Sequence, residues 1–370
     1  MTKTAFITDW LDKYGGAERV VTAINEIYEF DYYYAYVNKM SPQLQQKTFA
    51  GREVKIISSN IMSLFKYKFR VTMPIFPLII KMFNKQTKNN EIDLVISSSW
   101  TMSKGYRIGK EIHICYLQAR NFKYVWDEAD LYFKGPLKLL SFIKGYLQKF
   151  DLESAKIPDH LISNSLFLQN WVKEKYKRDS VVIYPPVDVE DFYISNTSED
   201  YYITVGRLEP YKRFDIIVEA FTQNKKKLVV IGDGTELKYL KSIAGSNIEF
   251  KGYLDKGKIK DYLSKSKAFV FAGVEDFGIV IIEAHASGVP SIVYNGGAAN
   301  EIVNKVNGLC YEIQSAESLN MKIVDFENQF MNYDKNKIRE SSLKFSKERF
   351  KCEMKSYVEL LKDKCLPHLN

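Results

Sequence analysis

The sequence predicts an α/β protein built from two doubly wound parallel-sheet domains. Short apolar segments alternate with segments of helical periodicity, and this alternation runs twice along the 370 residues. Between the two runs lies Tyr184-Pro185-Pro186, where two prolines stiffen the chain and remove two backbone donors. We therefore expect one domain at residues 1–185, a second at residues 186–345, and a tail at residues 346–370.

In the first half, apolar segments bounded by turn residues predict strands, and longer segments of 3.6-residue periodicity predict helices. The expected strands are 4–8, 32–37, 54–57, 94–97, 112–116 and 160–163, and the expected helices are 17–28, 131–155 and 166–176. Residues 181–184 then lead into the two prolines.

The second half starts the alternation again, so its sheet is expected to be separate and its strand ends to face a shared cleft. The expected strands are 202–205, 227–231, 248–250, 268–272, 291–294 and 309–311, and the expected helices are 214–222, 236–244, 258–264, 280–287 and 299–303. The charged stretch 335–366 predicts a helical tail that can cross back to the first domain.

Composition predicts a cytoplasmic protein without a structural metal. The four cysteines show no CxxC spacing, so we expect reduced thiols that bind no metal. The first residues read as a strand rather than as a secretory signal. No apolar run approaches the roughly 20 residues that a membrane-spanning helix needs, and the run 71–83 is broken by Pro74, Pro77 and Lys81.

Positive charge is concentrated in the first half, where 27 Lys and Arg face 18 Asp and Glu, against 26 and 27 in the remainder. The segment 62–88 is the most basic and has five phenylalanines or tyrosines between its cations. Such a segment favours an anionic membrane surface or a lipid phosphate. A solvated helix face over core aromatics is the alternative. Nucleic acid fits less well, because no nucleic-acid motif accompanies the charge.

Two carboxylates, Glu275 and Glu283, flank a predicted strand-to-helix loop. The apolar residues 268–272 read as a buried strand, and Gly278 precedes a helix that Gly288 and the proline after it would end. In a parallel sheet, such a loop lies at the carboxyl ends of the strands, where ligands bind. The helix start suits an anion, whereas the two acids suit the hydroxyl groups of a sugar or a ribose.

A second loop, after the predicted strand 202–205, places Arg207 and Lys212 close together in sequence. A planar guanidinium and a compact ammonium on one loop match a diphosphate. The alternative interpretation is a solvated basic turn. The neighbouring Glu275 to Glu283 segment favours the diphosphate.

Three glycine turns follow other predicted strands. Gly15-Gly16 lies in the first strand-to-helix loop, where missing side chains let backbone N–H groups approach a ligand. Gly296-Gly297 precedes Glu301, which we interpret as a first-turn helix acid rather than a catalytic one. Residues 232–234 form a further turn that could line a base pocket or be a plain turn.

Taken together, these motifs resemble family 4 of the retaining glycosyltransferases. The resemblance covers nearly the whole chain, keeps the order and spacing of the motifs, and is most specific in the second half. The motifs are Gly15-Gly16, Gly206-Arg207 with Lys212-Arg213, Glu275 to Glu283, and Gly296-Gly297 with Glu301. The resemblance implies the GT-B fold, in which two Rossmann-like domains face a central cleft that holds a nucleotide sugar.

The family pattern implies roles for these residues. Arg207 and Lys212 would hold the diphosphate, Glu283 the ribose and Glu275 the donor sugar, which makes Arg207, Lys212 and Glu275 the catalytic set. The implied donor-binding positions are Gly15, Gly16, Gly206, Phe277, Gly278, Ile279, Val280 and Glu283.

A narrower resemblance links the chain to mannosyltransferases of surface-polysaccharide and lipopolysaccharide O-antigen assembly, which commonly use GDP-mannose. It rests on residues 14–19, 96–99, 184–188 and 275–279. Two positions depart from that pattern, because Trp100 and Gln118 stand where the family usually has histidines. Gln118 can hydrogen-bond a hydroxyl but cannot carry a proton, so no mechanism here uses a histidine at that place.

From the resemblance we expect a hexosyltransferase that retains anomeric configuration and transfers from a GDP- or UDP-sugar. We expect no cofactor, and no metal because no Asp-x-Asp motif stands at a suitable strand end. The basic aromatic stretch 65–88, with Lys123 and Trp126, would face a polyprenyl-diphosphate-linked glycan at the inner face of the cell membrane. Gln118 is the third single residue expected at the acceptor. A nucleotide-sugar epimerase and a non-catalytic nucleotide-sugar-binding subunit are the alternatives.

Overall fold

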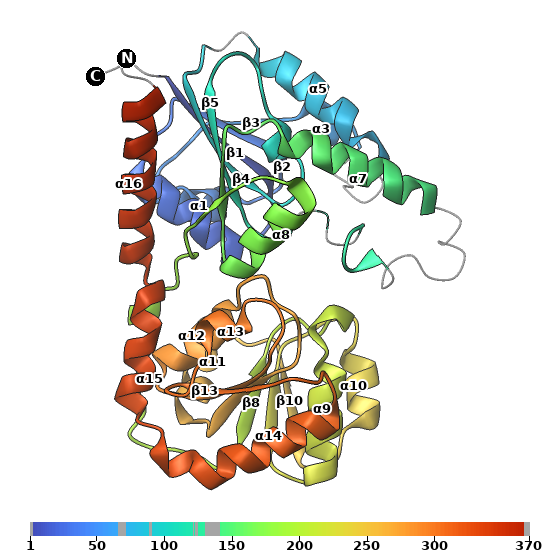
Figure 1. Cartoon of the computed structure of the whole chain (residues 1–370), viewed down its shortest axis with the longest axis vertical. Helices are drawn as coiled ribbons and strands as arrows, with labels where there is room; N and C mark the ends of the chain where they lie inside the picture. Colours follow the sequence, from blue (N-terminus) through green and yellow to red (C-terminus); the bar gives the residue numbers. More distant parts are fainter. Residues whose placement is uncertain are drawn as a thin grey trace. The chain divides into compact units, whose positions relative to one another are not determined.

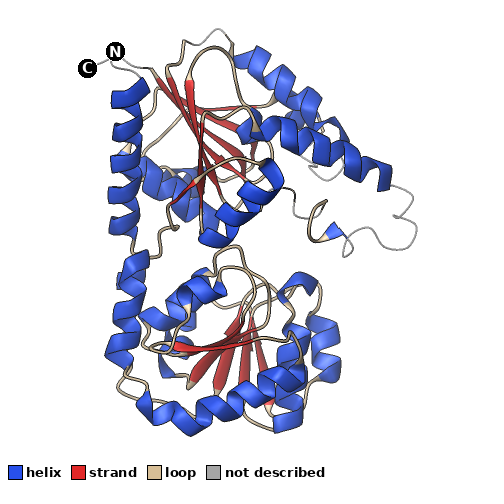
Figure 2. Ribbon diagram, in the orientation of Figure 1, coloured by secondary structure: helices blue, strands red, loops and turns tan. Residues whose placement is uncertain are grey.

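The computed structural model describes residues 3–65, 72–88, 91–120, 122, 125–129 and 141–365. It divides into two compact units, coloured along the sequence in Figure 1. The first unit comprises residues 1–186 and 350–370, and the second comprises residues 187–349. The chain thus leaves the first unit after Pro186 and returns to it at Phe350. Each unit is a parallel sheet with helices on both faces (Figure 2).

The first unit contains a seven-stranded sheet in the order β3-β2-β1-β4-β5-β6-β7, and every pairing is parallel. The order reverses direction between β1 and β4, which makes their carboxyl ends the switch point of the sheet. The strands are β1 (Thr4–Leu11), β2 (Tyr32–Asn38), β3 (Ile56–Ser58), β4 (Leu94–Ser99), β5 (Ile112–Leu117), β6 (His160–Ser163) and β7 (Val181–Val182). The longer helices are α1 (Gly16–Ile27), α2 (Pro42–Thr48), α3 (Asn60–Leu64), α5 (Phe76–Thr87), α7 (Ser141–Ala155), α8 (Leu166–Tyr176) and α16 (Lys347–Cys365).

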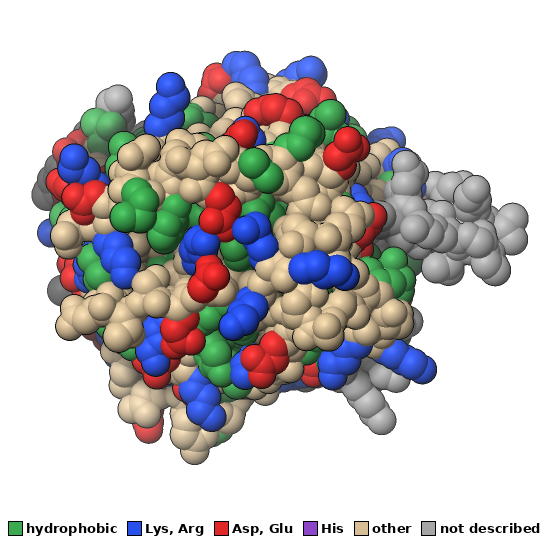
Figure 3. Space-filling model, turned by 90° about the horizontal axis from the view of Figure 1, so that it is seen from below, with side chains coloured by type: hydrophobic (Ala, Val, Ile, Leu, Met, Phe, Trp, Pro, Cys, Tyr) green, Lys and Arg blue, Asp and Glu red, His purple; other side chains and the backbone are tan. Residues whose placement is uncertain are grey.

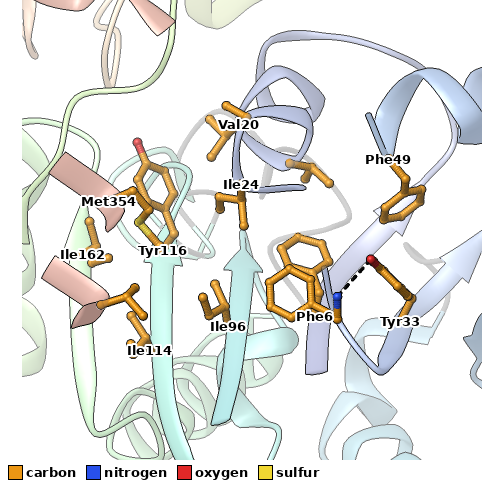
Figure 4. Close-up of a cluster of buried hydrophobic side chains, with 14 of the residues drawn as sticks. Phe6, Val20, Ile24, Tyr33, Phe49, Ile96, Ile114, Tyr116, Ile162 and Met354 are labelled. Carbon is orange, nitrogen blue, oxygen red and sulfur yellow. Dashed lines mark hydrogen bonds between the residues drawn. The ribbon is translucent and has the colours of Figure 1, made fainter. Parts of the chain in front are cut away.

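Alternation along β1 separates two hydrophobic cores. Phe6 points to the face that α1 and α16 cover, whereas Ala5 and Ile7 point to the face that α3 and α5 cover. Figure 4 shows Phe6 in the first of these cores beside Ile96, with Met354 of α16 near Tyr116. The α16 side chains in this core recur at helical spacing. They are Phe350, Met354, Val358 and Leu361.

The second unit contains a six-stranded parallel sheet in the order β10-β9-β8-β11-β12-β13, with its switch point between β8 and β11. The strands are β8 (Tyr202–Val205), β9 (Leu228–Ile231), β10 (Ile248–Gly252), β11 (Ala268–Phe271), β12 (Ser291–Tyr294) and β13 (Gly308–Tyr311). The helices are α9 (Phe214–Asn224), α10 (Leu237–Ile243), α11 (Lys256–Lys265), α12 (Ile279–Ala286), α13 (Ala299–Ile302), α14 (Ala316–Gln329) and α15 (Lys335–Ser342). On the face seen from below, acidic and basic side chains alternate without a patch of one sign (Figure 3).

The stretch 335–366 was predicted as a helical tail, and the structure divides it into more than one helix. The segment is α15, a 3-10 turn at Leu343–Phe345, and then α16. Ser346 separates them with an extended backbone (ψ 156°), and its hydroxyl accepts a hydrogen bond from the Arg349 N–H at 3.3 Å. A serine in this position is an N-cap, which begins a new helix rather than continuing an old one.

Four of the described helices were not among those expected from the sequence: α2, α3, α5 and α14. In α5, Pro77 lies at the start of the helix, where its fixed φ is favourable and its missing N–H costs nothing. The same holds for Pro42 in α2. Pro77 had been interpreted as an interruption of the apolar run 71–83, and Pro42 had been given no role. Of the helix expected at 131–155, the structure describes residues 141–155.

Two fully buried histidines make the stability of both units depend on pH. Burial lowers the pKa of His113 and of His285 to about 3. The native protein therefore keeps both rings neutral, while the unfolded chain takes up protons below about pH 6.5. The contribution of the two neutral rings to the free energy of unfolding is fully present above pH 6.5. This contribution is lost progressively as the pH falls from 6.5 toward 3.

We predict that the free energy of unfolding falls by about 2 kcal/mol per histidine between pH 6.5 and pH 5. Urea unfolding at several pH values measures this loss. His285→Gln should reduce the pH dependence of the second unit and leave that of the first unit unchanged. An equal slope in the variant and the parent would show that His285 is not buried as the neutral ring.

Candidate functional site

The loops that follow β8 and β11 meet through an ion pair between Lys212 and Glu275. Their side chains are 17% and 24% exposed, so the pair is partly shielded from water and still reachable by a ligand. The Lys212 ammonium also lies 5.5 Å from the centroid of the Phe271 ring. Two of the three residues predicted as catalytic are therefore in direct contact.

Arg207, the third, is exposed on the same loop as Lys212. One Nη donates a hydrogen bond to the Tyr211 hydroxyl at 3.1 Å. The Tyr211 ring centroid lies 5.6 Å from the Lys212 ammonium, so this ring touches both cations. Tyr211 was not predicted as a site residue from the sequence. A guanidinium has five N–H donors, so the bond to Tyr211 leaves capacity for an anion.

Two glycines allow the backbone to hold this geometry. Gly297 has φ +70°, and a Cβ there would lie 2.1 Å from the Glu275 carbonyl oxygen. That same oxygen accepts a hydrogen bond from the Ala298 N–H at 2.9 Å. A Cβ on Gly273 would lie 3.0 Å from the Lys212 backbone. The Gly296-Gly297 turn therefore fixes the position of Glu275.

Gly278 begins α12 beside the ion pair. Its φ of +106° turns the chain sharply into the helix. Ile279 and Val280 are in the first turn, where backbone N–H groups have no helical acceptor, and both are partly exposed. Phe277 before the turn is buried against the Phe345 ring, with centroids 5.6 Å apart. Glu283 lies further along α12 and is only 7% exposed.

Gly206 follows β8 directly and lies against the next loop. A Cβ on Gly232 would be 1.8 Å from the Gly206 carbonyl oxygen, so the turn at 232–234 must be glycine where it passes this backbone. The Gly206 N–H donates to the Ile231 carbonyl at 3.0 Å. The structure thus explains both positions by close backbone approach.

In the first unit, the Gly15-Gly16 turn opens α1. The Gly15 N–H donates to a Glu18 carboxylate oxygen at 2.8 Å, which is the second half of a capping box. Burial raises the pKa of the Glu18 carboxyl. This N–H therefore serves the helix start in the structure.

The residues predicted to meet an acceptor do not form a single cluster. The Gln118 amide donates to the Ser98 hydroxyl at 2.9 Å, beside the carboxyl end of β4. The Trp126 indole N–H donates at 2.9 Å to Asp151, which also forms a fully buried ion pair with Lys104 at 2.6 Å. Trp126 is thus bound into the interior. Lys123 lies outside the described residues.

Sequence reasoning missed an aspartate that organises the loop after β4. The fully buried Asp9 of β1 accepts the N–H groups of four successive residues, Trp100 to Ser103, at 2.6 to 2.9 Å. The Trp100 ring stacks on that of Trp10, with centroids 5.8 Å apart and planes 9° apart. The pairing of Thr8 of β1 with Ser98 of β4 brings Asp9 to this loop.

Residues 190–341 match the family described as Glycosyl transferases group 1. The second unit is a glycosyltransferase group 1 domain. All the second-unit residues predicted for the donor site, from Gly206 to Glu283, lie inside the matched segment.

Curated relatives match part of the chain. The chain is 30% identical over 216 residues to an uncharacterized glycosyltransferase, MJ1178, of Methanocaldococcus jannaschii, covering 55% of this chain and 60% of that protein. It is 34% identical over 111 residues to a GDP-mannose-dependent alpha-mannosyltransferase of Corynebacterium glutamicum, covering 30% and 27%. The first match therefore spans less than two thirds of the relative's own length.

Solved structures show that the whole chain has the GT-B fold. Anabaena Alr3699/HepE in complex with UDP matches with a TM-score of 0.73 at 16% identity, covering 97% of this chain and all of that one. Sucrose-phosphate synthase from Thermosynechococcus elongatus matches with a TM-score of 0.74 at 17% identity, covering 98% and 100%. The predictions of two Rossmann-like parallel-sheet domains and of the GT-B class are confirmed.

Two other features are absent from the residues that the structure describes. No three or more His, Cys, Asp or Glu side chains in the described part of the chain are grouped to hold a metal ion. No helix among the described residues is long and apolar enough to cross a bilayer.

We predict that Gly297→Ala destabilises the group 1 domain by roughly 3 kcal/mol or more, because strain at positive φ is added to a clash with the Glu275 carbonyl. Urea unfolding measures the change. Gly252→Ala is the matched control, since Gly252 has φ +67° but a Cβ there meets nothing within 4 Å. It should cost only about 1 kcal/mol. Equal losses in the two variants would contradict the close approach at Glu275.

Proposed function

We propose that this protein is a retaining, metal-independent hexosyltransferase that uses a nucleotide-diphosphate sugar. The observation that carries the proposal is the contact between Lys212 and Glu275 beside the start of α12, with Arg207 on the same loop. A cation pair for a diphosphate thus lies next to a carboxylate for a sugar hydroxyl, inside a glycosyltransferase group 1 domain.

In this proposal, the donor replaces the ion pair between Lys212 and Glu275. Lys212 then contacts the diphosphate, and Glu275 contacts a sugar hydroxyl. Without a ligand, Lys212 and Glu275 neutralise each other. When the donor binds, Lys212 and Arg207 hold the diphosphate, Glu275 accepts a hydrogen bond from the transferred sugar, and Glu283 binds the ribose. The first-turn N–H groups of α12 add the positive end of the helix dipole.

The two cations also supply the catalytic stabilisation in this proposal. As the bond between the sugar and the diphosphate breaks, negative charge grows on the leaving phosphate, where Arg207 and Lys212 already point their donors. The leaving diphosphate then takes the proton of the acceptor hydroxyl on the same face of the sugar, which retains configuration. The positive charge of these side chains stands where other enzymes use a metal ion.

Mannose is the favoured hexose and GDP the favoured nucleotide. The support comes from relatives named as GDP-mannose-dependent mannosyltransferases of Corynebacterium glutamicum. UDP-sugars are the second choice, since structural neighbours are described in complex with UDP or UDP-glucose. A relative from a Klebsiella pneumoniae cps region, 26% identical over 164 residues, supports a role in surface-polysaccharide synthesis.

A membrane-facing surface on α3 and α5 would bring the enzyme to a polyprenyl-diphosphate-linked acceptor. The exposed face of these helices combines large apolar side chains with cations and, among the described residues 60–65 and 72–88, has no acid. This combination favours peripheral contact with an anionic bilayer. The residues are Leu64, Phe65, Leu78, Lys81, Met82, Lys85 and Lys88.

We predict that Arg207→Ala with Lys212→Ala lowers the transfer rate by about ten-thousandfold, since each lost donor costs about 3 kcal/mol of barrier. In a thermal-shift screen, GDP-mannose or a UDP- or dTDP-sugar should raise the melting temperature of the parent but not of the double variant. Lys227→Ala, an exposed lysine before β9, is the control and should behave like the parent. A double variant that transfers sugar at the parental rate would refute the diphosphate site.

We predict that Lys81→Glu with Lys85→Glu lowers co-sedimentation with phosphatidylglycerol-containing liposomes at least tenfold, because two attractive charges become repulsive. Lys225→Glu with Lys227→Glu in the second unit changes the net charge equally and serves as the control. Parental binding by the first variant, or equal loss in both, would show that α5 does not face the bilayer.

A further inference from the structure

Trp10 and Trp100 form a stacked pair at the switch point of the first sheet. Trp10 lies near the carboxyl end of β1, and Trp100 follows the last residue of β4, its neighbour. Their ring centroids are 5.8 Å apart, and the planes differ by only 9°. Both residues remain partly exposed, although the strand residues before them are buried. A broad aromatic surface is thus presented where parallel sheets bind ligands.

Hydrogen bonds to Asp9 fix the backbone that carries Trp100. Both Asp9 carboxylate oxygens are used, Oδ2 by the N–H groups of Trp100 and Thr101, and Oδ1 by those of Met102 and Ser103. The Ser103 hydroxyl adds a further bond to Asp9 at 2.8 Å. Asp9 is fully buried, so these charge-assisted bonds are shielded from water. Such support is what a binding surface needs to keep its shape before the ligand arrives.

A purely structural role explains only part of this arrangement. Trp10 does pack against the core that includes Tyr34 and Ile7. Trp100 is not among the residues of that core, and its ring stacks on that of Trp10. The exposed part of each indole gains nothing from the hydrophobic effect, so packing against the core does not account for that part.

The charged neighbour of the rings, Asp9, is buried and bonded to the backbone after β4. Ser98 and Ser99 end β4, Thr101 follows Trp100, and all three side chains are buried. Gln118 donates to Ser98, and its N–H donates to the Ser99 carbonyl at 3.0 Å. An electron-rich indole face attracts the polarised C–H bonds of a pyranose and repels an anion. The exposed indole surface therefore fits the C–H face of a neutral sugar better than it fits an anion.

We propose that the Trp10–Trp100 pair is the stacking surface for the acceptor's terminal pyranose, with Trp100 in direct contact and Trp10 supporting it. The assignment rests on the proposed glycosyltransferase function, because it gives the first unit the acceptor sugar. It also selects the acceptor class: a neutral glycan end, rather than a bare polyprenyl phosphate, receives the hexose.

The test uses ligand-observed saturation-transfer NMR on the full chain without nucleotide. The probes are methyl glycosides of mannose, glucose, galactose and N-acetylglucosamine. We expect at least one glycoside to receive saturation mainly at the C–H protons of one ring face. Trp100→Ala should reduce this signal at least tenfold, and Trp100→Phe should retain part of it. Tyr146→Ala removes an aromatic ring that is 48% exposed on α7 and should leave the signal unchanged.

Three results would overturn the proposal: no glycoside binding to the parent, binding that persists in folded Trp100→Ala, or binding that disappears in Glu275→Gln. The last would place the glycoside at the donor site. Donor turnover is read separately as slow hydrolysis of the nucleotide sugar. If hydrolysis is absent while the Trp100-dependent signal is present, the proposed glycosyltransferase function is wrong. The Trp10–Trp100 pair is then still a sugar-binding surface. In transfer, Trp100→Ala is expected to raise the acceptor KM at least tenfold.

Discussion

The second unit depends on one partly shielded ion pair at the carboxyl edge of its sheet. Lys212 and Glu275 come from loops that are distant in sequence, and their contact fixes how these loops pass each other. Gly273 and Gly297 make the approach possible, because any side chain at either position would meet backbone atoms of Lys212 or Glu275. Outside a bound state, each charge satisfies the other, so neither is left desolvated without a partner.

In the first unit, one carboxylate and several backbone N–H groups fix the loop at the carboxyl edge of the sheet. Asp9 gathers successive N–H groups after β4 and so shapes the edge of the sheet without a metal or a second charge. Both units therefore place their best-fixed polar interaction at the switch point of a parallel sheet, where the chain diverges to either side and leaves room for a ligand. The fold thus determines the position of the polar interaction. The first unit uses an aspartate with backbone N–H groups, and the second unit uses a lysine–glutamate ion pair.

Much of this architecture could be predicted from the sequence, because strand-and-helix alternation is a local signal. Glu275, Lys212 and Gly297 were identified from their place after apolar segments, and the structure gives each a contact. Asp9 could not be identified in this way, because its partners lie about ninety positions away and are backbone groups without a side-chain signature. Pro77, which opens α5, misled the prediction for a related reason. A proline can end one helix or start another, and only the packing around it decides.

The return of the chain at Phe350 has a consequence for biogenesis. Residues 350–361 supply four apolar side chains to the core of the first unit, and they are synthesised only after the whole of the second unit. While the ribosome is still translating residues 187–349, the face of the β1-to-β7 sheet that α16 covers is incompletely covered, and Tyr116 lacks its Phe350 neighbour. The nascent first unit thus exposes an aggregation-prone apolar surface throughout that interval. Premature termination before Phe350 would leave this surface exposed permanently.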